Sequence, residues 1–475
     1  MENQTTSAST KFRIAFYSFD EAGALATLRL LDPAKFMGIE VMHGSIGGRI
    51  DVDIVDNADI VVLQRDFSRD LDFYEQILLC AHRNNIPVVL DLDDLLFELP
   101  ENHPDRISGY YAAALLPMLQ AVMEVDLVTV ATPELRDYIL PYNSNVVVIP
   151  NYFDDNIWKM REPADPLIES SRITIGYMGG GSHLPDLQMI EPALLSIVNK
   201  SAKEVRFKFW GIEAPSQLAE LSEVYWVPPK SATYADFAEF FQAQSADVVI
   251  APLCDTFFNS CKSPIKYLEY GSIGVPGVYS AIAPYSRVVE NGEDGFLVTS
   301  LEEWESRLLQ LINDPKLRQE IAANAQAKIK SDWLLSRNAK EQYLVYKECI
   351  ARHGIQKRDP FRFLPAVRML ARQMFEWKSL AVPEEANLRA QLRQARYDVS
   401  TLQSGFKAAN KKISTLFAEN RKLIYERQNL QNRIAEREKE IVDLEEEIVN
   451  YANSFSWRVT RPLRKIAKTI RRNHQ

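Results

Sequence analysis

Two lysines and a glutamate lie within eight residues of one another in this 475-residue chain, and their side chains suit a phosphorylated sugar. Lys262 and Lys266 carry ammonium groups that can neutralise phosphate. Glu269 follows Lys266 by about one helical turn. A carboxylate there is a poor phosphate ligand, but it accepts hydrogen bonds from sugar hydroxyls beside the phosphates. The three residues therefore predict a binding site, and a capped helix of an ordinary α/β domain is the alternative.

The predicted elements around these residues would hold them at the end of a strand. The run 247–253 is short, apolar and β-branched, which predicts a buried strand. Ser263 is a good N-cap and precedes a proline, so we expect a helix over 264–270 that ends at Gly271. A helix N-terminus at the carboxyl end of a parallel strand binds anions through its free backbone amides. The helix start would thus join the two lysines around one anion.

A glycine triplet follows another predicted strand, 173–177. It is Gly179, Gly180 and Gly181, and Ser182 and His183 come next. Glycines at this place let the backbone approach a ligand or turn sharply, although the triplet is not the dinucleotide fingerprint GxGxxG. His183 could reach a phosphate or a sugar hydroxyl. A plain turn with a structural histidine is the alternative.

Three aspartates, Asp91, Asp93 and Asp94, end the predicted strand 86–90. Because ligands bind at the carboxyl ends of parallel strands, these side chains lie on the edge where a site is expected. Asp93 could orient an acceptor hydroxyl or accept its proton. Helix capping of the segment 95–100 by Asp93 or Asp94 is the alternative.

Strands alternate with helices twice along the chain, once over 13–150 and again over 173–349. This alternation predicts two doubly wound α/β domains with parallel sheets. Residues 1–10 are a polar lead, and the polar, proline-containing stretch 155–172 is the expected linker. Between the strand 205–210 and Pro228 we expect a helix.

The remaining C-terminal residues change character three times. Residues 351–384 form a basic, aromatic-rich amphipathic connector. Residues 385–455 repeat apolar positions at 3–4 spacing, with seventeen of twenty heptad core positions apolar, which predicts a coiled coil and a parallel homodimer. Residues 456–475 hold seven Lys/Arg and no Asp/Glu around helically spaced apolar residues, which is typical of a helix lying on an anionic membrane surface. The alternative to the coiled coil is an isolated helix or one folded back on the two domains, and a trimer or a hetero-partner is the alternative to the homodimer. For the tail, the alternative is a solvated basic end.

Composition narrows the class of protein. A net charge of −9 argues against general nucleic-acid binding. The four cysteines are scattered, without the spacing of a zinc site or a disulfide framework. The N-terminus lacks an apolar signal region, and no apolar run reaches the length of a spanning helix. We therefore expect a cytoplasmic protein whose membrane contact is peripheral.

The stretch 259–280 resembles the nucleotide-sugar site of retaining GT-B glycosyltransferases, family 4 in particular. That family has a Glu-x7-Glu motif here, followed by a Gly-x-Pro run. Glu269 matches the second Glu, which in the family binds the ribose, whereas Cys261 stands where the first would be. The resemblance covers about residues 12–350. It implies a GT-B fold with an acceptor-side domain over 11–160 and a nucleotide-sugar-binding domain over 172–350.

The resemblance also implies roles for the candidate residues. Asp93, Lys262 and Glu269 would be catalytic. Gly23, Arg29 and Asp94 would lie on the acceptor side, where a surface salt bridge is as plausible for Arg29; Arg65 is a weaker candidate. The donor would be bound by Gly179, Gly180, Gly181, Ser182, His183, Lys262, Ser263, Lys266 and Glu269. GT-B enzymes resemble one another in needing no metal, so neither a metal nor a cofactor is expected beside the nucleotide-sugar donor.

The implied function is transfer of a hexosyl or deoxyhexosyl group, with retention, from a nucleotide-diphosphate sugar to a growing surface glycan of the lipopolysaccharide, O-antigen or capsule type. That acceptor, glycan or lipid-linked, would place the enzyme on the inner face of the cell membrane. A phosphorylase or epimerase on the same fold is an enzyme alternative. A catalytically degenerate scaffold organised by its coiled coil is the other, favoured by the missing Glu at position 261.

Overall fold

The structure is a computed structural model that describes residues 11–20, 23–167, 171–228, 233–354, 363–376, 391–392, 399 and 429–450. The chain divides into two compact units. The first comprises Met1–Pro104 and Pro117–Leu364, and it contains both parallel sheets. The second comprises Asp105–Leu116 and Pro365–Gln475.

The first sheet has six parallel strands in the order β2-β1-β5-β6-β7-β8. The inner strands are continuous apolar runs because both faces of a parallel sheet are covered. Their bounds are β1 Arg13–Tyr17, β2 Glu40–His43, β5 Ile60–Gln64, β6 Val88–Leu92, β7 Leu127–Val130 and β8 Val146–Val148. A two-stranded antiparallel ribbon, β3 Ser45–Ile46 with β4 Arg49–Ile50, follows β2.

Helical segments connect these strands. They are α1 Ala24–Ala26, η1 Thr27–Leu31, α2 Asp32–Met37, η2 Asp53–Asn57, η3 Arg65–Arg69, α3 Leu71–Arg83, η4 Leu96–Glu98, α5 Leu115–Glu124 and α6 Pro133–Ile139. The short α4 Pro104–Ile107 and η5 Ala112–Ala114 lie between η4 and α5.

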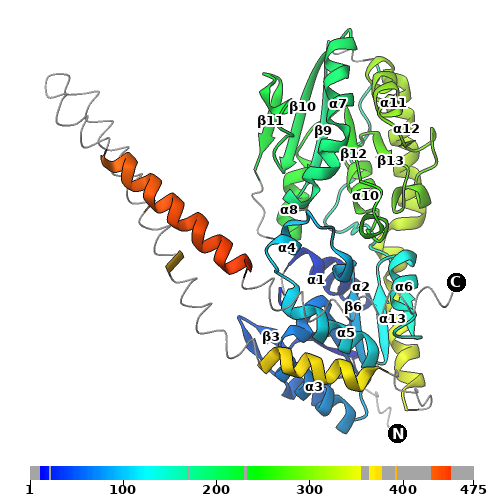
Figure 1. Ribbon diagram of the computed structural model, residues 1–475. Helices are drawn as coiled ribbons and strands as arrows, with labels where there is room; N and C mark the ends of the chain where they lie inside the picture. The colour runs from blue at the N-terminus through cyan, green and yellow to red at the C-terminus, as the bar shows by residue number, and fades with distance from the viewer. Residues whose placement is uncertain are drawn as a thin grey trace, which may run out of the picture. The chain divides into compact units, whose positions relative to one another are not determined.

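The second sheet also has six parallel strands, in the order β11-β10-β9-β12-β13-β14 (Figure 1). The bounds are β9 Arg172–Gly179, β10 Glu204–Gly211, β11 Val224–Val227, β12 Val248–Ala251, β13 Gly277–Ser280 and β14 Phe296–Val298. The order reverses between β9 and β12, so the crevice at the carboxyl ends of these two strands is the expected ligand position of a doubly wound fold.

The helices of the second half include one that returns to the first sheet. The connecting segments are η6 Gly181–His183, α7 Leu184–Lys200, η7 Leu218–Glu220, α8 Tyr234–Gln242, α9 Phe257–Ser260, α10 Ile265–Ser272, η8 Tyr285–Arg287, α11 Leu301–Asn313, α12 Pro315–Lys328, η9 Ile329–Trp333 and α13 Leu335–Arg352. Tyr346 and Cys349 of α13 are buried in the same core cluster as Ile14, Phe16 and Val62 of the first sheet. The core of the first half is therefore completed by the last helix of the unit.

The fold class predicted from the sequence, α/β with two parallel sheets, is confirmed, and two details differ. The edge strand β2 was not expected. Between β10 and residue 228 the chain forms the single turn η7 and the edge strand β11 where a helix was expected. Tyr225 and Trp226 leave β11 half exposed, with 42% and 47% of their surface accessible, so the segment lacks the apolar run of a buried strand. The domain limits 11–160 and 172–350 stay predictions.

The C-terminal predictions are mostly outside the described residues. Helices over 364–376 and 429–450 are described in this region (Figure 1). In the helix 429–450 the predicted core positions Leu430, Ile434, Ile441, Leu444 and Ile448 are less exposed than their neighbours. Apart from residues 391–392 and 399, the rest of the predicted coiled coil 385–455 and the tail 456–475 fall on residues the structure does not describe. In the part of the chain that it does describe, no helix is both long and apolar enough to span a bilayer.

Candidate functional site

The glycine triplet 179–181 forms a turn, the glycine turn, at the carboxyl end of β9 on one side of the crevice. Gly180 and Gly181 are exposed, and a Cβ at either would meet open space. Their backbone is therefore accessible to a ligand, and Ser182 and the helix start follow at once. Gly179 is constrained instead, because a Cβ there would lie 2.6 Å from the hydroxyl of Tyr177.

The helix α10 begins and ends differently from the prediction. Pro264 is its N-cap and no side chain caps it. The Ser263 hydroxyl instead accepts a 3.0 Å hydrogen bond from Asn151 Nδ2, so Ser263 is tied to the segment that leaves the first sheet. Gly271 lies inside the helix, where a Cβ would meet Ile329 Cδ1 at 2.3 Å. The chain turns at Gly274, whose φ of +68° requires glycine.

The cationic side chains converge beside the glycine turn. Lys266 Nζ lies 3.4 Å from His183 Nε2, and Lys262 Nζ lies 4.4 Å from the ring centroid of Phe258. Burial and the charge of Lys262 lower the pKa of Lys266 to about 8. Burial and the charge of Lys266 lower the pKa of His183 to about 4. Burial is the largest cause of both shifts, and the positive charges of the lysines add to it, so a bound anion would relieve the cost of holding these groups charged.

Glu269 is buried one turn into α10, with 4% of its surface exposed. The hydroxyl of Tyr234 lies 3.4 Å from Glu269 Oε1 and donates to it. Burial raises the pKa of Glu269 to about 8, although Lys266 and the Tyr234 hydroxyl oppose the shift. A carboxyl that is protonated near neutral pH both donates and accepts hydrogen bonds, which suits a pair of vicinal hydroxyls.

Asp186 is a site residue to which the sequence assigned no role. Its Oδ2 lies 2.8 Å from His183 Nδ1, and its Oδ1 accepts hydrogen bonds from the backbone of Cys254 at 2.7 Å and from Asn259 Nδ2 at 3.2 Å. It therefore joins α7 to the loop after β12 and holds the His183 ring. The His-x-x-Asp spacing at a predicted helix start was the available signal.

The aspartates after β6 form the opposite edge of the site. Arg65 Nε lies 3.0 Å from Asp93 Oδ1, and Arg65 Nη2 lies 3.4 Å from Asp94 Oδ2. Burial raises the pKa of Asp93 to about 6 even though Arg65 opposes the shift. Burial also acts to raise the pKa of Asp94. The positive charges of Lys262 and Arg65 have the larger effect, so the pKa of Asp94 is lowered. Arg65 has a φ of +48°, an uncommon conformation for a residue with a side chain.

The structure places Asp93 and Asp94 in ion pairs rather than at a helix cap. The turn η4 starts without a side-chain cap. Among the described residues no group of three or more His, Cys, Asp or Glu is arranged to hold a metal ion.

Arg29 lies inside the first half instead of at its surface. Its guanidinium makes two hydrogen bonds to Asp91, Nε to Oδ2 at 3.1 Å and Nη2 to Oδ1 at 2.6 Å. It also donates to Asn151 Oδ1 at 3.0 Å and to the carbonyl of Ile149. Arg29 is 2% exposed, and Asp91 also accepts from the hydroxyl of Thr129 at 2.7 Å. This buried network occupies the guanidinium that was expected to face an acceptor.

Gly23 starts α1 after β1. A Cβ there would lie 2.1 Å from Asp20 Oδ2, the end of an exposed side chain that would have to move aside. The structure shows no further contact that would assign Gly23 to an acceptor.

Direct contacts join the two halves of the first unit next to the site. The Thr132 hydroxyl donates to the carbonyl of Cys261 at 2.8 Å, and Arg287 pairs with Glu134. Lys262 Nζ lies 3.9 Å from Asp94 Oδ1. Lys262 thus lies between the anion site of one half and the aspartates of the other.

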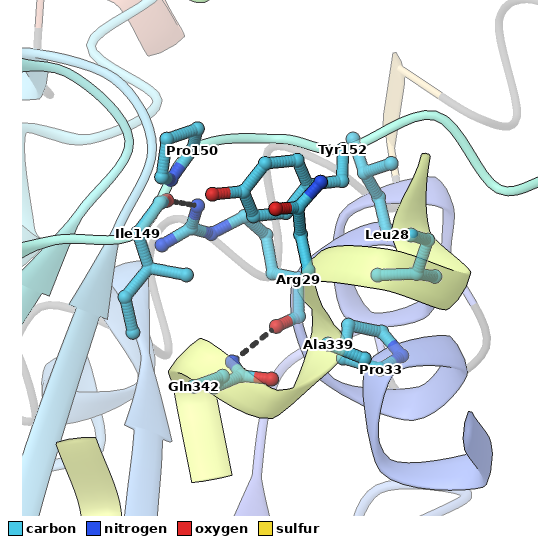
Figure 2. Close-up of a pocket in the computed structure, with 10 residues that line it drawn as sticks. Leu28, Arg29, Pro33, Ile149, Pro150, Tyr152, Ala339 and Gln342 are labelled. Atoms are coloured by element: carbon cyan, nitrogen blue, oxygen red, sulfur yellow. Dashed lines mark hydrogen bonds between the residues drawn. The ribbon is translucent and has the colours of Figure 1, made fainter. Parts of the chain in front are cut away.

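A small pocket lies at the crossover between the halves, apart from the glycine turn. Figure 2 shows that it is lined by η1 and α2, by the segment after β8 and by α13. The Gln342 side chain donates to the carbonyl of Arg29 at 2.6 Å across it. The pocket belongs to the packing that fixes α13 against the first half.

Comparisons with known proteins support one class. Residues 173–314 match the family model described as "Glycosyl transferases group 1". A crystal structure of Anabaena HepE in complex with UDP and glucose is 18% identical, with a TM-score of 0.51, and the match covers 71% of this chain and 100% of that one. Sucrose-phosphate synthase from Thermosynechococcus elongatus is 12% identical, also with a TM-score of 0.51, covering 72% and 100%. A comparison with curated proteins finds no match.

Residues 173–314 thus resemble the glycosyl transferases group 1 family, and the two-sheet architecture is similar to that of the solved GT-B structures. The matched region contains the glycine turn, His183, Lys262, Lys266 and Glu269. The class that the fold and the site support is a GT-B glycosyltransferase.

Proposed function

We propose that this protein transfers a sugar from a nucleotide-diphosphate donor to a growing cell-surface glycan, with retention at the anomeric carbon, as a family 4 enzyme. The observation that carries the proposal is the convergence of Lys262, Lys266 and His183 at the switch point of the second sheet, with depressed pKa values for Lys266 and His183. A diphosphate supplies the negative charge that this arrangement lacks.

The chemistry assigns a different task to each edge. Bond cleavage between the sugar and the diphosphate leaves negative charge on the phosphate oxygens, and Lys262, Lys266 and the amides of Gly180 and Gly181 would stabilise it. Glu269 would bind the ribose hydroxyls. On the other edge, Asp93 would orient the acceptor hydroxyl and take its proton, with Asp94 beside it. Neither a metal nor a cofactor takes part in this proposal.

The decisive test is Glu269→Ala. Among the described residues the Glu269 side chain makes one weak hydrogen bond, to Tyr234, so the fold should be retained. Donor affinity and turnover should fall by about 10- to 100-fold, the effect of losing one or two hydrogen bonds. Purified protein would be screened against UDP-, GDP-, ADP- and dTDP-sugars, with released nucleotide as the readout. Wild-type transfer by the variant would contradict the assignment.

The scaffold alternative rests on position 261. Cys261 is buried, with 0% exposure, and its carbonyl accepts the bond from Thr132, so this position carries no carboxylate for the donor sugar. A scaffold predicts no affinity for any nucleotide sugar. Calorimetry with the same donor panel separates it from the enzyme.

We also propose that the protein acts at the inner face of the cell membrane as a homodimer. The apolar seam of 385–455 would pair two chains, and the basic tail 456–475 would bind an anionic leaflet and so bring the site to a lipid-linked acceptor. Light scattering on the full chain and on a chain ending near residue 384 tests the first part. Flotation with anionic and neutral vesicles, with and without 456–475, tests the second.

A further inference from the structure

His183 lies between a carboxylate and an ammonium group, and this placement fixes the tautomer of its ring. Nδ1 is 2.8 Å from Asp186 Oδ2, and Asp186 already accepts two other hydrogen bonds, so Nδ1 carries the hydrogen in that contact. Nε2 is 3.4 Å from Lys266 Nζ, which can only donate. Nε2 is therefore unprotonated in the structure, and it is the ring nitrogen that faces the Lys266 ammonium group.

The charges around the ring come from three sides. Asp186 of α7 favours the imidazolium, whereas Lys266 of α10 and Lys262 before it oppose it. Asp94, from the loop after β6, also interacts electrostatically with His183. Only 12% of the side chain is exposed, so burial adds to the effect of the two lysines, and the ring is neutral at pH 7.

We propose that His183 takes up a proton from solvent on Nε2 when the diphosphate of the donor binds, and then donates that hydrogen to a phosphate oxygen. Asp186 is the positioning residue that makes this possible, because it holds Nδ1–H and stabilises the resulting imidazolium. Lys266 keeps its own protons and turns from Nε2 to the diphosphate. The site thus gains one positive charge as the donor enters. This inference rests on the proposed function.

Protonation is expected because the bound diphosphate changes the sign of the electrostatic potential at His183 Nε2. Without a ligand, two ammonium groups surround Nε2 and disfavour a third positive charge. A bound diphosphate ester carries two negative charges that offset both ammonium groups and leave the Asp186 carboxylate as the dominant neighbour on the other side. By linkage, protonation of His183 must tighten donor binding by the same factor by which the donor favours protonation.

Calorimetry of UDP-glucose and the other nucleotide sugars at pH 6, in buffers of different ionisation enthalpy, measures the protons taken up. These diphosphate esters do not titrate near this pH, so the count reports the protein. We expect close to one proton per donor bound, and donor affinity that falls by up to about tenfold per unit of rising pH. His183→Gln should bind with no uptake from this residue, and Asp186→Asn should bind more weakly with a reduced count.

The matched control is His353, which forms a similar pair with Asp126, Nδ1 to Oδ1 at 3.1 Å, at the same 12% side-chain exposure. Among the described residues, no lysine contacts it. His353→Gln should leave the proton count unchanged. Nitrogen-15 NMR of the six histidines, with His183→Gln as the assignment, should show Nε2 bare in the free protein and both nitrogens protonated in the complex.

The outcomes distinguish the protonation of His183 from the proposed function. Donor binding with an unchanged count in His183→Gln, or a His183 ring that stays neutral in the complex, overturns this inference and leaves the proposed function standing. A failure of every donor in the panel to bind overturns both.

Discussion

Every aspartate at the end of β6 has an arginine beside it, Asp91 with Arg29 and both Asp93 and Asp94 with Arg65. At the crevice of the second sheet, Lys266 instead makes no ion pair with any described residue, and its polar neighbour is a neutral histidine. The aspartates of the first edge are thus held in ion pairs within the protein. The second edge is incomplete, as expected where an anionic ligand supplies the missing charge. The proposed function uses this difference, with the aspartates acting on a neutral hydroxyl and the lysines on a diphosphate.

Breaking the buried pair of the first edge should have the largest effect on the fold. Arg29→Met leaves Asp91 inside the protein without its counterion, and we expect a loss of about 3–5 kcal/mol in the free energy of unfolding. Urea denaturation measures it. Adding Asp91→Asn should restore part of the loss, since the uncompensated charge is then gone. Full stability of Arg29→Met would mean that this edge is not organised by internal pairing.

Removing a lysine from the second edge should reduce activity without reducing the stability of the fold. Lys266→Met eliminates a charge that the fold disfavours, so the free energy of unfolding should stay equal or rise, while kcat/KM with the donor falls by about 10²–10³. Lys200→Met is the control, because Lys200 pairs with Glu305 at the exposed surface and should change neither quantity. If Lys266→Met lowered the free energy of unfolding and left kcat/KM unchanged, Lys266 would be a structural residue and the contrast between the two edges would fail.

Asp93 shares a property with each edge. It is ion-paired, like the other aspartates after β6, but its charged form is disfavoured, as it is for Lys266. Its pKa of about 6 exceeds that of an unfolded aspartate, so the folded chain binds this proton more tightly. Protonation therefore stabilises the fold, and that contribution is lost as pH rises through about 6. Asp93→Asn should melt a few degrees above wild type at pH 8 and level with it near pH 4.

The activity of Asp93→Asn should follow a different rule. Transfer should fall by about 10²–10⁴ because an amide cannot accept the acceptor's proton, while donor affinity stays unchanged. Thermal melts and transfer assays over pH 4–8 test both halves. A parallel loss of donor binding would place Asp93 on the wrong edge.

The smallest effect is expected at the contact between the halves. Arg287 is 47% exposed and pairs with Glu134, so Arg287→Ala should change the free energy of unfolding by about 0–1 kcal/mol. Donor affinity and turnover should match wild type. A clear kinetic change would show that the two edges are coupled through their surface contacts as well as through ligands.

The fold was predictable where apolar runs encode it. The predicted strands 86–90, 173–177, 205–210 and 247–253 overlap β6, β9, β10 and β12. The edge strands β2 and β11 were not predicted, because half-exposed strands do not carry that signal.

The candidate site was less predictable because its contacts are long-range. Lys262, Lys266 and His183 could be named from local motifs and do converge. The partners that fix their environment could not, since Asp186 bonds to residues 68 and 73 positions away. For the same reason Arg29 was expected to face a ligand, when its partner Asp91 lies 62 positions along the chain. Spacing finds residues of one helix or loop, whereas ion pairs between elements depend on how those elements meet.

The return of α13 to the first sheet has a consequence for synthesis on the ribosome. The first sheet is complete in sequence at Val148, but its core cluster needs Tyr346 and Cys349, about 200 residues later. At roughly 5–20 residues per second this gap lasts on the order of 10–40 s. During that time the apolar surface that α13 covers is exposed on the nascent chain. A domain that looks complete by its strands is thus a client for chaperones until the far end of the second domain has been made.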